Sequence, residues 1–201
     1  ACEDLQSRIY KLVELDGLHK LRKRYPDGSF AEETLYYIVR FYGWLYAVSR
    51  YGPYTQDAVV IQHSAAIRRA FSTSSGDHEV GPFNFFPAEQ KALGKMIMHS
   101  MEGEFGHEMD TISYYEFRDF IQSPYRMPES SAVAQTLETL HKAKHSEDIV
   151  GRERLIVAQN HLVDLLNYLE KKLGYSYFPA ERKKCSHLRR TTSDRLARSA
   201  A

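Results

Sequence analysis

The sequence has few of the residues that mark a disulfide-stabilised or catalytic protein. It holds two cysteines in 201 residues, Cys2 and Cys185, close to opposite ends of the chain. Two cysteines cannot build a disulfide framework or a zinc site alone, so we expect free thiols, with a single bridge between the ends as the alternative. No phosphate-binding glycine loop, catalytic-triad signature or zinc-knuckle spacing occurs. These absences favour a non-enzymatic role, and we expect no catalytic residue, no metal and no cofactor.

The chain also lacks a stretch that reads as a membrane span. The most apolar stretch, residues 30–48, contains Glu32, Glu33 and Arg40, and each of these charges is costly inside a bilayer. It therefore predicts a buried helix of a bundle. Because the sequence begins with Ala1 rather than Met, two locations stay open: the cytoplasm, or a membrane to which a segment upstream of Ala1 tethers the domain.

The net charge of the chain is small, but its charged residues are unevenly distributed along the sequence. The formal net charge is +1, but residues 181–201 hold seven Lys and Arg against two acidic residues. This leaves 20 basic and 24 acidic residues, a net charge of −4, in residues 1–180. We expect one all-α domain over 1–180 and a basic, flexible C-terminal tail over 181–201. Such a tail can make weak contact with an anionic membrane or a nucleic acid.

Strand-like alternation is absent as well, and helical periodicity takes its place. Apolar residues recurring every three or four positions predict seven helices, over residues 3–24, 29–51, 56–71, 87–102, 113–122, 130–145 and 148–173. Capping boxes at Ser29 and Ser113 mark two helix starts. The helix over 29–51 is apolar or aromatic almost all the way round, which is typical of a helix packed on several sides. The predicted fold is an irregular all-α bundle of six or seven helices around this central aromatic-rich helix.

Arg40, in the middle of the aromatic helix, is the first candidate for a binding site. A buried arginine needs a carboxylate or a polar cavity, and Glu116 and Asp119 are candidate partners. If a groove is exposed, Arg40 could hold an anionic or aromatic ligand with residues of the same helix, namely Tyr37, Trp44 and Tyr51. The alternative is a structural ion pair, or an arginine whose head group reaches water along its aliphatic stem.

His63, on the apolar stripe of the helix over 56–71, is the second ligand-binding candidate. A buried histidine can act as a general base when a nucleophile is near, but the sequence marks no such nucleophile. The alternative is a core histidine that is hydrogen-bonded to a tyrosine hydroxyl or a backbone carbonyl.

Two Glu-x-x-His matches have the spacing that carboxylate-bridged di-iron bundles use. They are Glu104–His107 and Glu138–His141. A chain with this many Glu and His gives such pairs by chance, and Gly103 and Gly106 interrupt the first one. Neither pair is therefore a reason to expect a metal.

The function that these features favour is a non-enzymatic helical scaffold or protein-interaction domain with an unidentified protein partner. It could form the soluble part of a membrane-associated protein. An exposed apolar or aromatic patch of several hundred Å² would support this interpretation. The alternative is a small-molecule binder or enzyme with a concave pocket near Arg40 and Trp44. A metal-binding helical bundle is the third interpretation.

Overall fold

The computed structural model describes residues 1–14, 17–51, 56–72, 81–103, 106–123, 131–174 and 182–185. Within these ranges it contains one antiparallel hairpin and eight α-helices. The helices are α1 (Cys2–Val13), α2 (Gly17–Arg24), α3 (Phe30–Tyr51), α4 (Ala58–Ala70), α5 (Pro87–Ile97), α6 (Tyr114–Gln122), α7 (Ala132–Lys142) and α8 (Arg152–Leu173). The hairpin pairs β1 (Met98–Gly103) with β2 (Gly106–Thr111), and a short 3₁₀ helix, η2 (Ser146–Asp148), precedes α8. The predicted all-α bundle with a central aromatic-rich helix is confirmed.

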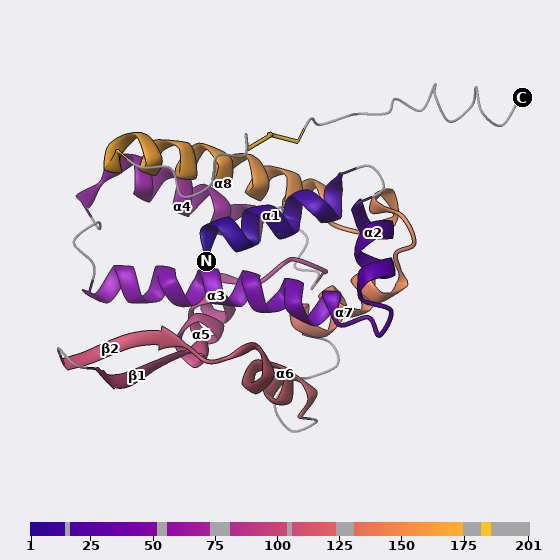
Figure 1. Ribbon diagram of the computed structural model, residues 1–201, viewed down its shortest axis with the longest axis horizontal. Coiled ribbons are helices and arrows are strands. Elements are labelled where there is room, and N and C mark those ends of the chain that lie inside the picture. The colour runs from indigo at the N-terminus through magenta and orange to yellow at the C-terminus, as the bar shows by residue number, and fades with distance from the viewer. Residues whose placement is uncertain are drawn as a thin grey trace, which may run out of the picture.

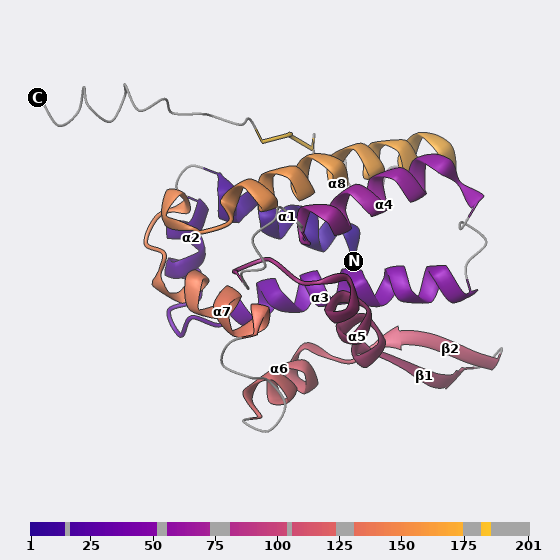
Figure 2. The ribbon, with the colours of Figure 1, turned by 180° about the vertical axis from the view of Figure 1, so that it is seen from behind.

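The helices are arranged in layers around α3. Helices α4 and α8 lie side by side along one side of the molecule, and α1 lies between them and α3 (Figures 1 and 2). Helices α5 and α6 and the hairpin occupy the opposite side of α3 (Figure 1). Helix α3 packs against α1, α5, α6 and α7, which explains why its sequence is apolar in every direction. No helix in the described part of the chain is long and apolar enough to cross a membrane.

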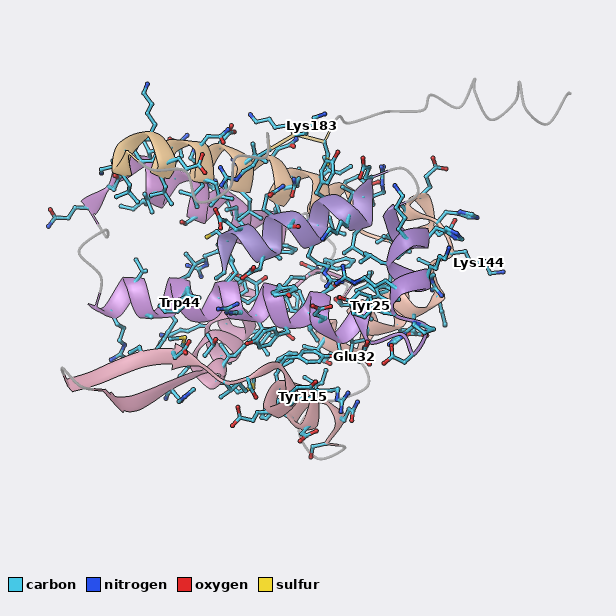
Figure 3. The ribbon with its side chains drawn as sticks, viewed as in Figure 1. Tyr25, Glu32, Trp44, Tyr115, Lys144 and Lys183 are labelled. Carbon is cyan, nitrogen blue, oxygen red and sulfur yellow. The ribbon has the colours of Figure 1, made fainter. Side chains whose placement is uncertain are left out.

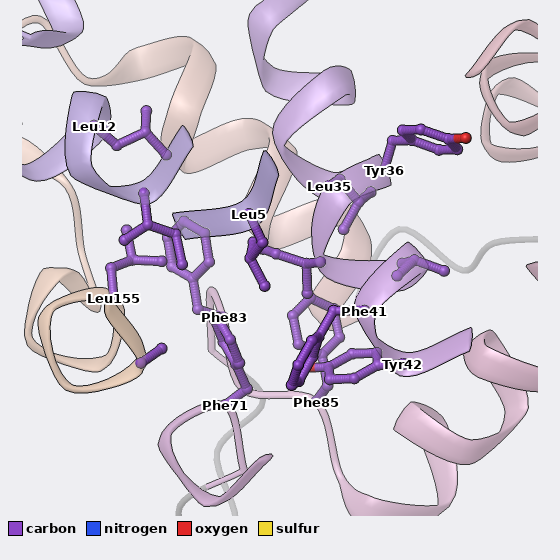
Figure 4. Packing of buried hydrophobic residues seen from close by; sticks show 14 of the residues in the cluster. Leu5, Leu12, Leu35, Tyr36, Phe41, Tyr42, Phe71, Phe83, Phe85 and Leu155 are labelled. Carbon is purple, nitrogen blue, oxygen red and sulfur yellow. The ribbon is translucent and has the colours of Figure 1, made fainter. Parts of the chain in front are cut away.

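Aromatic side chains fill much of the core on both sides of α3. The Tyr42 ring meets Phe71 and Phe85 edge-on, with ring centroids 6.3 and 5.9 Å apart (Figure 4). On α6, Phe117 is fully buried and lies 5.5 Å from the Tyr36 ring. Full burial of a large apolar side chain is worth about 1.5–3 kcal/mol, so these clusters contribute strongly to the stability of the bundle.

Helix α5 crosses α3 closely enough to leave no room for a side chain at one position. A Cβ atom added to Gly94 would lie 2.6 Å from the Tyr42 carbonyl oxygen. Since backbone atoms cannot move aside as a flexible side chain would, Gly94 sets the distance between the two helices.

Two predicted helices are wrong in extent, and a third, predicted over 148–173, begins only at Arg152. Residues 3–24 form two helices, α1 and α2, and α2 begins so close to α1 that a side chain at Gly17 would collide with the Lys11 carbonyl. Residues 87–102 do not continue as a helix beyond Ile97. The chain instead forms β1, with Met98 opposite Thr111, so the absence of strands predicted from the sequence is also wrong.

The two predicted capping boxes have different outcomes. At α6, Ser113 Oγ accepts from the Glu116 N–H (3.3 Å) and Glu116 Oε2 accepts from the Ser113 N–H (2.8 Å), as predicted. The Ser29 hydroxyl instead donates to Asp27 Oδ1 (2.8 Å), and Glu32 faces His141 (3.6 Å). The helix begins directly after Ser29, as predicted, but the capping box predicted there is wrong.

Asp57 ties the N-terminus of α4 to the C-terminal half of α8. Its Oδ1 accepts from the N–H groups of Val59 (3.0 Å) and Val60 (3.1 Å). Its Oδ2 accepts from the Tyr168 hydroxyl (2.9 Å) and pairs with Lys172. The Lys172 ammonium, followed by the Val60 amide, lowers the pKa of the Asp57 carboxyl to about 2.

Part of the segment predicted as a tail packs on the bundle. Arg182 pairs with Glu3 (2.9 Å) and Glu170 (2.6 Å), so it joins α1 to α8. The backbone of Cys185 exchanges two hydrogen bonds with the Asn160 side chain, of 2.9 and 3.1 Å. Residue 181 and residues 186–201 lie outside the described residues. Cys2 and Cys185 are free thiols, as predicted.

Candidate functional site

Tyr37 and Arg40 lie on one face of α3 and both contact carboxylates. Arg40 Nη1 donates to Asp4 Oδ2 (3.0 Å), so its partner comes from α1 and not from the two α6 carboxylates that the sequence suggested. The Tyr37 hydroxyl donates to Glu33 Oε1 (2.9 Å), and burial together with this hydrogen bond raises the pKa of Tyr37 to about 12. The geometry is that of a structural contact between α3 and α1.

Arg8 completes this contact from the α1 side. Its guanidinium carbon lies 5.5 Å from the centroids of both the Tyr25 and the Tyr37 rings, and it pairs with Glu33. The Arg8 side chain is almost fully buried, so its charge pairs with Glu33 and its guanidinium faces contact the two tyrosine rings inside the protein. The hydroxyl and the ring of Tyr37 are therefore already engaged by Glu33 and Arg8.

Trp44 and Tyr51 complete the set of residues that the sequence grouped with Arg40. Trp44 is half-buried and packs against the core from α3 (Figure 3). Tyr51 is the last residue of α3, and its side chain lies outside the described residues. The structure therefore joins Tyr37 and Arg40 to α1 through Arg8 and Asp4.

A groove lies on the opposite face of α3. It has a volume of about 590 Å³ and is lined by Tyr42, Leu45, Tyr46, Ser49 and Arg50 of α3, by Arg68 of α4, and by Pro87, Ala88, Gln90 and Lys91 of α5. Successive residues of an α-helix are rotated by about 100°, which places Tyr42 and Ser49 roughly opposite Arg40 and Trp44. The groove therefore lies on α3, but on the face away from Arg40 and Trp44.

Three cations from three helices surround the groove. The Arg50 guanidinium lies 5.6 Å from the centroid of the Tyr46 ring, and Arg68 Nε donates to Gln90 Oε1 (3.2 Å). Lys91 is exposed. No carboxylate occurs among the described residues that line the groove, and within the described ranges none of the three cations forms an ion pair. The described lining therefore carries three positive charges and no negative one, although the charge of Glu89 on α5 also acts on Tyr42.

The floor of the groove is apolar and includes one buried hydroxyl. Leu45, Tyr46, Pro87 and Ala88 supply carbon surface. Tyr42 is 3% exposed, and its hydroxyl has no hydrogen-bond partner among the residues that the structure describes. Burial raises the pKa of Tyr42 well above its ordinary value, so the phenol stays protonated and can donate a hydrogen bond.

His63 meets a second histidine instead of the tyrosine or carbonyl that we expected. Its Nδ1 lies 3.2 Å from Nδ1 of His161 on α8. Asp164, one turn further along α8, completes a cluster in which one donor atom from each residue lies within 4.8 Å of the others. All three side chains are half-buried. Burial, followed by the charge of His63, lowers the pKa of His161.

The sequence reasoning missed His161 and Asp164 because it searched only for Glu-x-x-His. A search for His-x-x-Asp on the longest predicted helix would have found them. Of the pairs that were considered, Glu138 pairs with Lys142. His141 faces the Glu32 carboxylate. Glu104 and the side chain of His107 lie outside the described residues.

The most exposed large apolar side chains in the described ranges come from different elements. They are Ile61 of α4, Phe86 before α5, Tyr115 of α6, Val150 before α8 and Leu173 at the end of α8. Phe86, which is 40% exposed, directly precedes α5 and the groove.

No family model matches the chain, and no curated protein and no solved structure is similar to it. Among the described residues, the groove and the histidine cluster supply the geometry on which a function is proposed.

Proposed function

We propose that the chain is a non-enzymatic helical interaction domain that binds an acidic segment of a partner protein in the groove between α3, α4 and α5. The observation that carries this proposal is the grouping of Arg50, Arg68 and Lys91 around an apolar floor. The rest of the domain has the opposite sign, since residues 1–180 carry a net charge of −4. A positive groove in an acidic body attracts and orients an acidic partner.

The residues of the groove define the chemistry of the segment. Leu45, Tyr46, Pro87 and Ala88 can pack against an apolar or aromatic side chain. The cations at the rim can pair with carboxylates on either side of that anchor. The first turn of α5 lines the groove, but Glu89 in that turn accepts a hydrogen bond from the Phe86 N–H, so the cations rather than the helix end supply the positive charge. A peptide in which acidic residues flank an apolar anchor satisfies all of these groups.

The location of the domain is a separate proposal. A segment upstream of Ala1 could tether the domain to a membrane. The basic residues of 181–201 could make weak contact with anionic lipid or nucleic acid. Both proposals are compatible with a groove that binds protein. The groove does not depend on either, because its cations come from α3, α4 and α5.

Fluorescence anisotropy with two matched peptide panels tests the proposal. In one panel Leu, Phe or Tyr is flanked by Glu, and in the other every Glu is replaced by Gln. We expect members of the Glu panel to bind at least about tenfold more tightly than their Gln counterparts. We also expect their affinity to fall with added salt, which screens the rim charges.

The chain offers a matched pair of charge reversals on α5. Lys91→Glu should weaken binding of the Glu peptides by at least about tenfold, because it places like charges together. Lys95→Glu makes the same change one turn further along, at an exposed residue outside the groove, and should change the affinity by less than about twofold. Failure of the Glu panel to bind, or equal losses in the two variants, would overturn the proposal.

A further inference from the structure

We propose that His63, His161 and Asp164 form a binding site for a divalent first-row transition-metal ion, with Zn²⁺ as the best fit, between the middle turns of α4 and α8. The site is independent of the groove, which shares no side chain with it. It also differs from the Glu-x-x-His pairs that the sequence suggested, since its carboxylate comes from an aspartate one turn after His161.

The two imidazoles have the separation that a shared metal ion requires. Zn–N bonds are about 2.0–2.1 Å long and the usual geometry is tetrahedral, so two nitrogen ligands of one ion lie about 3.3 Å apart. The Nδ1 atoms of His63 and His161 are 3.2 Å apart. A donor atom of Asp164 lies within 4.8 Å of the imidazole donors, so a small side-chain movement brings it into the coordination sphere. A direct hydrogen bond between the imidazoles is the competing explanation of this distance.

The pairing of α4 with α8 holds these residues opposite each other. At one end Asp57 binds Tyr168 and Lys172 of α8, and at the other Arg154 Nη1 donates to the Ala70 carbonyl (3.3 Å). The helices are therefore antiparallel and fixed at both ends, and their middle turns carry His63 and His161. Residues three apart on a helix share a face, so Asp164 lies on the same side of α8 as His161.

The donor set selects the class of ion. Two imidazole nitrogens and one carboxylate oxygen suit Zn²⁺, Co²⁺, Ni²⁺ or Cu²⁺, whereas Mg²⁺ and Ca²⁺ prefer oxygen ligands alone. Imidazole must be neutral to bind a metal ion. Because the three side chains are half-buried, a water molecule can reach the fourth position.

Lys184 competes with the ion for one of its ligands. Its Nζ lies 2.7 Å from Asp164 Oδ1, and the Asn160–Cys185 hydrogen bonds hold the neighbouring backbone against α8. A metal ion must share or replace this ion pair. Removing the lysine charge should therefore strengthen metal binding, by about two- to fivefold for a partly exposed pair.

Titration of the full chain with Co²⁺ and Zn²⁺ tests the site. Absorption of bound Co²⁺ reports its coordination, and competition against a chromophoric chelator gives the affinity for Zn²⁺. We expect one equivalent to bind. We expect His63→Gln, His161→Gln and Asp164→Asn each to weaken binding by at least about 100-fold, because loss of an outer-shell partner alone costs 10–100-fold. Lys184→Met should tighten it.

His19→Gln is the matched control, since it removes an exposed histidine from α2. Its affinity should stay within about twofold of the unmodified chain. Circular dichroism without metal shows which variants are folded, and three separate ligand variants allow the test to succeed if one of them is not. Uptake well below one equivalent, an equal loss in His19→Gln, or weaker binding in Lys184→Met would overturn the proposal.

Discussion

Replacing Tyr42 by Phe should stabilise the domain, although it deletes a polar group from a tyrosine that lines the groove. The Tyr42 side chain is 3% exposed, and none of the described residues bonds its hydroxyl. A hydroxyl that loses its water on folding and gains no partner destabilises the folded state. Phenylalanine keeps the ring contacts with Phe71 and Phe85 and removes only the oxygen.

The expected gain follows from the cost of burying an unpaired hydroxyl, which is about 1–3 kcal/mol. In a domain of this length each kcal/mol shifts the melting temperature by about 2–4 °C. Tyr36 provides the opposite case on the same helix, since it is 9% exposed and its hydroxyl donates to the Ile112 carbonyl (2.9 Å). Tyr36→Phe should therefore cost about 0.5–1.5 kcal/mol.

Urea unfolding of both variants, followed by circular dichroism, measures the two changes under the same conditions. The free energy of unfolding should rise in Tyr42→Phe and fall in Tyr36→Phe. A loss in Tyr42→Phe as large as the loss in Tyr36→Phe would refute the reasoning, because it would show that the Tyr42 hydroxyl has a partner in the folded protein.

Two further predictions concern the packing of α5 and the cap of α4. Gly94→Ala should lower the free energy of unfolding by about 1–3 kcal/mol in urea titrations, because the added methyl group meets the Tyr42 carbonyl. Gly81→Ala is the control, since position 81 has open space, and its free energy of unfolding should change by less than about 0.5 kcal/mol. Equal effects of the two substitutions would contradict this. Asp57 has a folded-state pKa of about 2 against an ordinary 3.8, so its carboxylate stabilises the fold above about pH 4 and loses that effect as the pH falls toward 2. Asp57→Asn should remove this part of the acid sensitivity, and an unchanged dependence of unfolding on pH would contradict it.

Those helices whose signals are local could be predicted from the sequence. The capping box at Ser113 and the long apolar stripe that ends before Gly174 depend on neighbours a few residues away. Helix α6 begins, and helix α8 ends, where these signals predict. The hairpin could not be predicted in this way. Its strands are fixed by pairing across a turn, while the spacing of Leu93 and Ile97 is equally compatible with a longer helix.

The candidate sites show the same limit. The sequence indicated Arg40 on α3 as a binding residue, but the residues that surround each face of α3 depend on where α1 and α5 pack. Asp4 of α1 therefore forms an ion pair with Arg40, and the groove lies on the other face, beside Tyr42. His63 could be identified as unusual, whereas its partner His161 is 98 residues away along the chain and lies beside it only through the pairing of α4 with α8.

Reversing the charges of both the groove and the peptide tests the central claim most directly. The affinity of the Glu peptides, and of the same peptides with Lys in place of Glu, would be measured for the unmodified chain and for Arg50→Glu/Lys91→Glu. We predict that the unmodified chain prefers the Glu peptides and that the double variant prefers the Lys peptides. A preference that is the same in both proteins would show that acidic segments do not bind at this groove.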